Sequence, residues 1–354
     1  MWKWDWICWL VSLISRTPQE RVRRFRRLIE RLSREADIDD DWWTVFREYP
    51  KSAKESSTVL TTTRSTDRVA IVMQGPVIER DQLTLETIRL YQRTMPEAEL
   101  IVSTWNSLSA AARHTIEGLG VHLVTGDPPA ETGPHNLNLQ IASTHRGLMK
   151  AKEIGCHYAM KTRADTRIHA QDIDRFCIDM LRKFPVSGAS LRPQRLLVMY
   201  FATRLYIPYH PSDLMMFGST EDLLFYWSLP LCGEELTFQV CDEFDRMLEQ
   251  SIPEIVVCRS FLQRSGVELT NRLDQWWQIL ADQFLVIDRD MIDFFWPKYN
   301  YNVDQRLGMK WDTTNMALCH FAQWMQIHSR SLVPGVSIDQ LMQQQVYDTL
   351  PKAA

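Results

Sequence analysis

The sequence predicts an α/β fold built on a doubly wound, mostly parallel sheet flanked by helices. Short apolar runs alternate with longer segments of helical periodicity over about 100 residues that begin near position 68. The apolar runs show no polar alternation, which is typical of strands buried on both faces. Hydrophobic residues make up 45% of the 354 positions and charged residues 24%, the ordinary values of a globular protein. These observations indicate one large α/β domain with additions, or two smaller domains.

Charge and cysteine usage exclude two function classes. The formal net charge of -4 gives no overall positive field, so we expect no nucleic-acid partner. The seven cysteines are scattered and none forms a Cys-x-x-Cys pair, so a zinc site is not indicated. Their odd number and spread suggest reduced thiols in a cytosolic chain.

The first 66 residues read as a basic arm and a linker rich in Ser and Thr. Residues 7–14 are apolar, but a membrane-spanning helix needs roughly 20 residues. Residues 21–32 combine arginines with an apolar stripe at helical spacing, and four tryptophans crowd the first nine positions. Such a helix suits an anionic membrane surface, so we expect a peripheral anchor on the cytoplasmic face. The alternative is a helix whose stripe packs on the next domain.

The strand–helix alternation begins after this arm. We expect strands at 68–73, 99–105, 121–124 and 158–160, with helices at 81–91, 109–118 and 136–151 between them. No Gly-x-Gly-x-x-Gly string follows the first strand and no phosphate-binding Gly-x-x-x-x-Gly-Lys-Ser/Thr is present. The sequence therefore supports neither dinucleotide binding nor a P-loop ATPase.

The stretch after the fourth predicted strand turns abruptly polar. Asp165 follows Arg163 by two residues where this strand leaves the sheet. Ligands of open α/β sheets bind beyond the carboxyl ends of the strands, and a carboxylate there can hold a divalent cation and through it a diphosphate. The alternative is a surface salt bridge at a strand end.

The second half continues the pattern less regularly. We expect a helix at 172–184, strands at 196–206 and 214–217, a helix at 221–229, and further helices at 312–330 and 334–350. His210, Ser212 and Asp213 precede the strand at 214–217 and suit sugar hydroxyl binding or proton handling. A structural histidine is the alternative for His210.

Five strings then occur in a fixed order. They are Val72-Met73-Gln74-Gly75-Pro76-Val77, Ser103-Thr104-Trp105, Asn136-x-Asn138-x-Gln140-Ile141, Lys161-x-Arg163-x-Asp165, and Pro208-Tyr209-His210-Pro211-Ser212-Asp213 followed by Phe217-Gly218. From Arg68 to Tyr301 the chain resembles the WavE-type lipopolysaccharide-synthesis family, which is regarded as a family of glycosyltransferases with a GT-A-like nucleotide-sugar fold. The resemblance implies a GT-A-like domain at 67–301, between the arm at 1–66 and a helical extension at 302–354.

The resemblance also implies a donor site at the carboxyl edge of the sheet. A nucleotide-sugar would contact seven residues there: Gln74, Gly75, Pro76, Asn136, Asn138, Arg163 and Asp165. Asp165 would be the ligand of Mn²⁺ or Mg²⁺, although Arg163 replaces the first acid of the family's Asp-x-Asp-like motif. Arg163 can instead pair with a phosphate directly, which leaves metal dependence open. The structural alternatives are a simple turn at Gly75-Pro76 and a helix N-cap at Asn136.

For catalysis the resemblance implies an acid–Gln pair on a helix that faces the active site. Asp282-Gln283 fits this pair, so Asp282 is the first candidate for the base that takes a proton from the acceptor hydroxyl. Asp213 is the second candidate, and His210 lies beside it. The alternative for Asp282 is a helix carboxylate paired with Arg or Lys.

Together these expectations describe a glycosyltransferase on the cytoplasmic face of the membrane. It would move a sugar from a nucleotide-sugar to a saccharide or lipid-linked acceptor in lipopolysaccharide or cell-surface polysaccharide biosynthesis. One alternative is a sugar nucleotidyltransferase, an enzyme class that would require a basic glycine-rich loop after the first strand. The other is a catalytically inactive, membrane-associated scaffold of the same fold.

Overall fold

The computed structural model describes residues 66–186, 191–233, 252–296 and 318–329, with the single positions 17, 20, 24 and 28. The chain divides into two compact units, Met1–Tyr49 with Tyr301–Asp304 and Pro50–Asn300 with Gln305–Ala354. Apart from these single positions, most of the predicted arm lies outside the described residues, as does most of the predicted extension. Within the described ranges, every helix is too short or too polar to cross a membrane.

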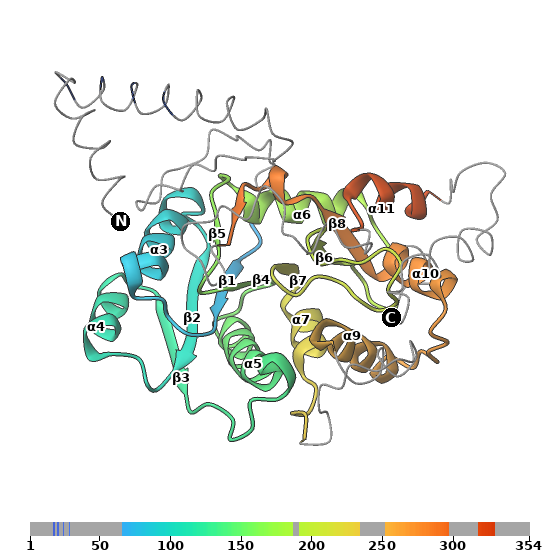
Figure 1. Ribbon diagram of the computed structural model, residues 1–354, viewed down its shortest axis with the longest axis horizontal. Helices are drawn as coiled ribbons and strands as arrows, with labels where there is room; N and C mark the ends of the chain where they lie inside the picture. Colours follow the sequence, from blue (N-terminus) through green and yellow to red (C-terminus); the bar gives the residue numbers. More distant parts are fainter. Residues whose placement is uncertain are drawn as a thin grey trace. The chain divides into compact units, whose positions relative to one another are not determined.

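A seven-stranded mixed sheet lies at the centre of the second unit (Figure 1). The strands are β1 (Val69–Gln74), β2 (Glu99–Trp105), β3 (His122–Gly126), β4 (Tyr158–Arg163), β6 (Leu196–Met199), β7 (Met216–Ser219) and β8 (Phe284–Ile287). Their order is β3-β2-β1-β4-β7-β6-β8, and β7 runs against the others. The predicted α/β fold with a mostly parallel sheet is confirmed.

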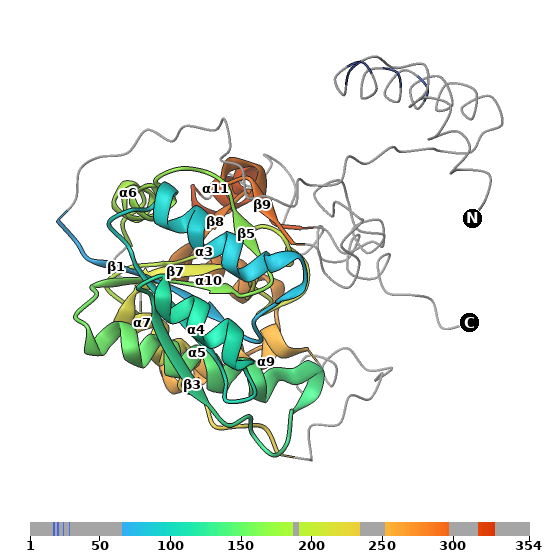
Figure 2. The same ribbon diagram turned by 90° about the vertical axis from the view of Figure 1, so that its left-hand side faces the viewer.

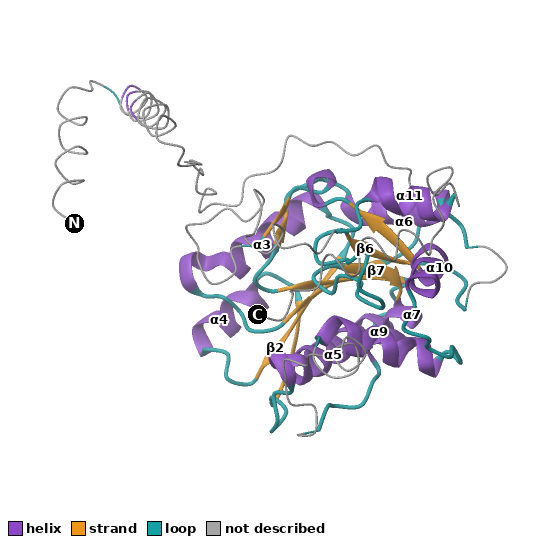
Figure 3. Ribbon diagram, turned by 45° about the vertical axis from the view of Figure 1, so that its right-hand side comes forward, coloured by secondary structure: helices purple, strands orange, loops and turns teal. Residues whose placement is uncertain are grey.

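Helices cover both faces of this sheet. They are α3 (Leu83–Thr94), α4 (Ala110–Gly118), α5 (Leu137–Glu153), α6 (Ile173–Lys183), α7 (Thr220–Trp227), α9 (Pro253–Arg264), α10 (Leu273–Gln283) and α11 (Phe321–His328). Helices α5, α7 and α9 lie on one side, and α3, α6 and α11 on the other (Figures 1 and 2). Figure 3 shows the strands enclosed between these two helical layers.

Short elements complete the described part of the chain. They are the 3-10 turns η2 (Arg80–Gln82), η3 (Pro134–Asn136) and η4 (Arg289–Met291), and the two-stranded ladder of β5 (Arg167–Ile168) with β9 (Phe294–Phe295). This ladder joins the segment after β4 to the segment after β8, so it links two strand ends at the same edge of the sheet.

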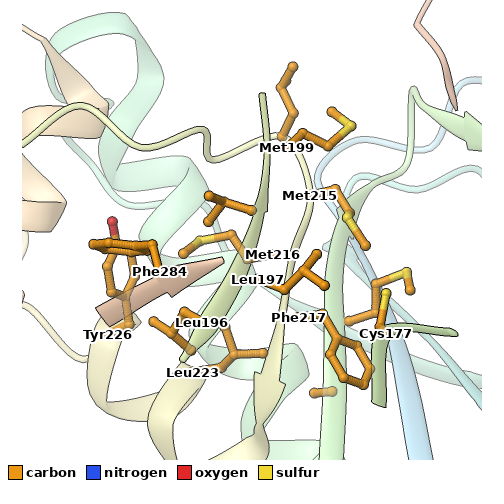
Figure 4. Close-up of a cluster of buried hydrophobic side chains, with 14 of the residues drawn as sticks. Cys177, Leu196, Leu197, Met199, Met215, Met216, Phe217, Leu223, Tyr226 and Phe284 are labelled. Atoms are coloured by element: carbon orange, nitrogen blue, oxygen red, sulfur yellow. The ribbon is translucent and has the colours of Figure 1, made fainter. Parts of the chain in front are cut away.

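Apolar side chains from the second half of the sheet form part of the core (Figure 4). Leu197 of β6 and Phe217 of β7 pair in register and are fully buried. Phe284 begins β8, and its ring lies 6.4 Å from that of Tyr226 on α7 in an edge-to-face contact. Because such close-packed interiors hold their strands firmly, the loops that leave these strands start from fixed positions.

Helix α5 packs closely over the first half of the sheet. A Cβ at Gly147 would collide with Cγ1 of Val72 on β1 and would lie 3.1 Å from Cβ of Ser103 on β2. The Ser103 hydroxyl donates to the carbonyl of Ser143 on α5 at 2.7 Å. Glycine at 147 therefore lets the helix approach the strands closely.

One predicted strand is shorter than expected. The apolar run 196–206 was expected to be a strand, but β6 ends at Met199 and the chain continues as the loop Tyr200–Met215. The Thr203 hydroxyl stabilises this loop. It donates to the carbonyl of Met199 at 2.5 Å and accepts from the amide of Ser212 at 2.9 Å. The apolar residues are buried in a loop instead of a strand.

Candidate functional site at the carboxyl edge of the sheet

The parallel strands bring several predicted residues to one edge. Gln74 ends β1 and Arg163 ends β4, and the two residues pair directly in register. The amide of Ala164 donates to the carbonyl of Gln74 at 2.9 Å, so the two strand ends remain joined as they leave the sheet. Asp213 approaches the same edge from the loop before β7, because Lys161 of β4 pairs with Met216. This edge is where ligands bind in open α/β sheets.

Gln74 is positioned by helix α5. Its side chain is only 5% exposed, and Oε1 accepts a hydrogen bond of 2.8 Å from the Ser143 hydroxyl. Gly75 follows with a φ of +102°, which a residue with a Cβ rarely adopts, so the turn itself needs glycine. Pro76 is exposed beyond it. The predicted turn is confirmed, and a contact of these residues with a donor stays a prediction.

The two asparagines before and within α5 differ in their environments. Asn136 is exposed and stands at the N-cap position of α5 with a φ of 65°, but its side chain makes no capping hydrogen bond. Asn138 is buried, and its amide donates to the carbonyls of Glu131 (3.0 Å) and Cys232 (2.8 Å). Its Oδ1 accepts from the amide of Cys232 at 2.7 Å. Asn138 thus ties two loops together, and its role in donor binding stays a prediction.

Arg163 and Asp165 form a bidentate ion pair. The Arg163 Nε and Nη2 each donate to one Asp165 oxygen at 2.8 Å. Trp296 Nε1 donates to Asp165 Oδ2 at 3.2 Å, and the Arg163 guanidinium lies over the Trp296 ring at 5.3 Å. Burial alone would raise the pKa of Asp165, but the ion pair with Arg163 and the hydrogen bond from Trp296 hold this pKa below its ordinary value.

This pairing does not fit the expected divalent cation. Mg²⁺ and Mn²⁺ need several oxygen ligands, and both Asp165 oxygens already accept hydrogen bonds from Arg163. Arg163 also stands where the first acid of the motif would be. Across the described residues, no three His, Cys, Asp or Glu side chains gather as a metal site would require. In this structure Asp165 is therefore the ion-pair partner of Arg163, and its expected role as a metal ligand stays a prediction.

A second group, the Asp213 cluster, comprises Gln140, Lys161, His210, Asp213 and Glu254. Gln140 Nε2 donates to Asp213 Oδ2, and Lys161 Nζ donates to the Asp213 carbonyl. Lys161 is fully buried over the Trp227 ring, 4.7 Å from its centroid, and burial lowers the pKa of Lys161 to about 8. The charges of Arg163 and Asp165 also act on Lys161, so the ion pair and the cluster are electrostatically coupled.

Two members of this cluster titrate unusually. Burial raises the pKa of Glu254 to about 7, and the negative charge of Asp213 adds to this rise. Burial lowers the pKa of His210 to about 3, helped by the positive charge of Arg204. His210 is therefore uncharged at neutral pH and a weak base, and its part in proton handling stays a prediction.

The expected base Asp282 lies at the opposite edge. Asp282 precedes Phe284, which begins β8 and pairs with Leu196, the first residue of β6. This row of the sheet includes Ala159, and Arg163 lies four residues further along β4, about 13 Å in strand rise. Asp282 accepts a hydrogen bond of 2.5 Å from Gln278, one turn earlier on α10. Its position contradicts the expectation that it faces the donor site.

The same helix carries a second Asp–Gln pair near its first turn. Gln275 Oε1 accepts from the hydroxyl of Tyr209 at 2.5 Å, and Trp276 Nε1 donates to the carbonyl of Arg204 at 2.9 Å. These contacts place Gln275 and Trp276 beside the loop Tyr200–Met215. The Trp276 side chain is completely buried.

Sequence reasoning missed an aromatic series at this edge. The Trp296 and Phe201 rings lie 6.2 Å apart, those of Phe201 and Tyr200 6.4 Å, and Tyr200 stacks on His320 at 4.2 Å. His320 Nδ1 also lies 3.1 Å from Asp288 Oδ1, just after β8. Only the tertiary fold brings these residues together, because the chain distance from Tyr200 to His320 gives no sequence signal.

Residues 69–340 match the family described as WavE lipopolysaccharide synthesis. The chain belongs to this family. The match extends past Tyr301, where the expected resemblance ended, and it includes α11. Among curated proteins, none matches the chain. The WavE membership confirms the resemblance that the five strings indicated.

Solved structures give weaker similarities. A protein of Desulfovibrio desulfuricans G20, assigned as a nucleotide-diphospho-sugar transferase, is 6% identical over 62% of this chain and 80% of that one, with a TM-score of 0.34. TarS of S. aureus is 10% identical over 55% of this chain and 33% of that one (TM-score 0.33), so the WavE chain spans about a third of TarS. HddC of Yersinia pseudotuberculosis is 11% identical over 44% and 79% (TM-score 0.27). These TM-scores are too low to support an argument.

Proposed function

We propose that this WavE-family chain is a glycosyltransferase that uses a nucleotide-sugar donor in lipopolysaccharide synthesis. The observation that carries the proposal is the joining of Gln74 and Arg163 at the carboxyl edge, in a family of lipopolysaccharide synthesis. Gln74 offers an amide to a base edge, and Arg163 offers a planar guanidinium to a diphosphate. The acceptor is a saccharide, free or linked to lipid.

In this proposal Arg163 takes the role that a metal ion has elsewhere. The leaving diphosphate gains negative charge as its bond to the sugar breaks, and a guanidinium held in place stabilises that charge. Trp296 and Asp165 fix the orientation of the guanidinium in the resting protein. Lys161 adds a positive charge below the strand ends.

Asp213 serves the sugar. Its Oδ2 already accepts a hydrogen bond from Gln140, and its position in the loop before β7 lets a carboxylate oxygen accept from a sugar hydroxyl. The half-buried Glu254 lies in the same cluster. The proposed arrangement thus places phosphate recognition at the end of β4 and sugar recognition beside it.

The arm at 1–66 completes the proposal as a peripheral anchor on the inner face of the membrane. A lipid-linked acceptor is presented at that surface, so an arginine-rich amphipathic helix would concentrate the enzyme near its acceptor. Vesicles with and without anionic lipid would separate this role from the alternative. Binding only to anionic vesicles, lost in a chain without the arm, is expected.

The transfer reaction itself is tested with lipopolysaccharide from cells that lack this gene. The purified protein is incubated with that acceptor and with radiolabelled UDP-, GDP- and CMP-sugars in turn. We expect label from one donor class to enter the lipopolysaccharide. A folded protein that transfers label from none of the donors, yet restores the lipopolysaccharide of those cells, would instead support the scaffold.

A further inference from the structure

We propose that His320, oriented by Asp288, is the general base that takes the proton from the acceptor hydroxyl. The inference rests on the proposed glycosyltransferase function and names a catalytic residue for it. His320 and Asp288 belong to none of the five strings, and neither is among the site residues predicted from the sequence.

The location of this pair is the first argument. Asp288 directly follows β8, which runs parallel to β6. It therefore emerges at the same edge as Arg163, three strands away in the order β4-β7-β6-β8. Neighbouring strands are about 4.8 Å apart, so this offset is roughly 14 Å. That span suits a donor whose diphosphate lies at Arg163 and whose sugar extends toward β8.

The geometry of the pair is the second argument. His320 Nδ1 lies 3.1 Å from Asp288 Oδ1, and the same oxygen accepts from the amide of Phe321 at 3.2 Å. The carboxylate is thus held at the first turn of α11. A carboxylate at Nδ1 fixes the tautomer in which Nδ1 carries the hydrogen, so Nε2 is the basic atom.

The surroundings of His320 are the third argument. The ring stacks on Tyr200 at 4.2 Å with an interplanar angle of 25°, while its side chain keeps 46% of its surface exposed. Backbone contacts hold the segment in place, because the amide of Cys319 donates to the carbonyl of Thr203 at 2.8 Å. His320 is therefore both oriented and accessible to an acceptor. The Arg289 guanidinium lies 5.9 Å from the centroid of the Tyr200 ring.

The aromatic series connects this base to the Arg163 pair. Trp296, Phe201 and Tyr200 contact one another in turn between Asp165 and His320. The other candidates fit less well, since Asp282 lies at the opposite edge and His210 is a weak base. The structural alternative for the pair is a simple cap of α11, in which Asp288 only satisfies the helix start.

The proposed step is a direct displacement with inversion at the anomeric carbon. The acceptor O–H bond breaks and its proton passes to Nε2 of His320. The oxygen forms a bond to the anomeric carbon as the bond to the diphosphate oxygen breaks, and the nucleoside diphosphate leaves with that electron pair. His320 then returns the proton to water.

The test measures nucleotide release from UDP- and GDP-sugars, with water or added truncated lipopolysaccharide as acceptor. For the donor that wild type uses, His320→Ala is expected to lower the rate at least about 100-fold, the usual value of a general base. The Kd of the matching nucleotide should stay within about twofold of the wild-type Kd, and added imidazole should restore part of the rate in His320→Ala. Asp288→Asn should lower the rate without imidazole rescue.

The control is His328→Ala, which changes the other histidine of the same helix. His328 stacks on Trp324 at 4.8 Å and lies 3.4 Å from Arg195, near the opposite edge of the sheet. The His328→Ala substitution should leave the rate of nucleotide release unchanged. Full activity of His320→Ala, or a loss that imidazole does not restore at unchanged nucleotide binding, would overturn the proposal for His320. A wild type that binds no nucleotide would remove the glycosyltransferase function itself and this base with it.

Discussion

At the scale of single residues, Asp213 and Asp282 show how strand direction decides which acid can act. Asp213 accepts from Gln140 at the carboxyl edge, whereas Asp282 lies before the first residue of β8 at the other edge. Both were candidates from the sequence, Asp282 because the family resemblance implies an acid–Gln pair and Asp213 because it stands with other polar residues before an apolar strand. The two acids can be assigned to opposite edges only once β6 is known to pair with β8, and local sequence does not encode this pairing.

Conservative substitutions of these two acids should have unequal effects. Asp213→Asn removes an anionic acceptor, and losing a hydrogen bond to a charged group costs about 1.5–3 kcal/mol, or roughly a 10- to 100-fold loss in kcat/KM. Asp282→Asn should stay within about twofold of wild type. Steady-state kinetics of sugar transfer measure both, and equal losses in the two variants would contradict the assignment of the site to the carboxyl edge.

His210 predicts a dependence of stability on pH. Its pKa falls from 6.5 to about 3 on folding because the ring is buried. Between these two values the unfolded chain binds the proton and the native protein does not. Stability from this group is therefore complete above pH 6.5 and is lost as the pH falls toward 3, by about 1.4 kcal/mol per pH unit.

Urea unfolding of wild type and His210→Gln at pH 6.5 and pH 5.0 tests this linkage. The wild type should lose about 2 kcal/mol more than the variant over this interval, since glutamine does not titrate. The comparison is between the two pH values of each protein, so any cost of the substitution itself cancels. The same loss in both proteins would show that the His210 ring is protonated in the native state.

At the scale of elements, the packing of α5 on β1 determines where Gln74 points. The helix supplies Ser143 to the Gln74 side chain, and Gly147 lets it approach Val72. In the sequence, Gly147 is only a glycine within a predicted helix, and it does not indicate the contact with Val72. The close approach depends on which strand the helix crosses, and that is a property of the assembled sheet.

Two Gly→Ala substitutions in helices should therefore differ in sign. Gly147→Ala places a methyl group against Val72, and such overpacking typically costs about 1–3 kcal/mol. Gly118→Ala in α4 meets no atom within 4 Å and should be neutral or stabilising by up to about 1 kcal/mol. Thermal or urea unfolding would measure both. A stable Gly147→Ala variant would show that α5 can move away from the sheet.

The elements themselves differed in how far the sequence predicted them. The strands at 68–73 and 99–105 were predicted almost to their ends, because burial on both faces leaves an unbroken apolar run. The run at 196–206 is equally apolar, yet beyond Met199 its residues are buried as a loop. Periodicity reports burial but not the backbone path, so the sequence alone could not distinguish these two cases.

At the scale of the whole molecule, the order of strands assembles the site from distant parts of the chain. Asp165 and Trp296 are 131 positions apart and share a hydrogen bond. The alternation of strands and helices predicted the common edge of Gln74 and Arg163, since parallel strands end on one side. It left open whether Asp165 holds a metal ion or forms a salt bridge, and in the structure Asp165 pairs with Arg163.

In the proposed mechanism, Arg163 binds the donor diphosphate without a divalent cation. Calorimetric titration with UDP, GDP and CDP, in EDTA and then in Mn²⁺, tests it most directly in wild type and in Arg163→Gln. Arg89→Gln is the control, since Arg89 pairs with Glu86 on the surface of α3. We predict that one nucleotide binds equally well in EDTA and in Mn²⁺, and that Arg163→Gln weakens binding at least about 10-fold while Arg89→Gln does not. Binding that requires Mn²⁺ and survives in Arg163→Gln would contradict the account.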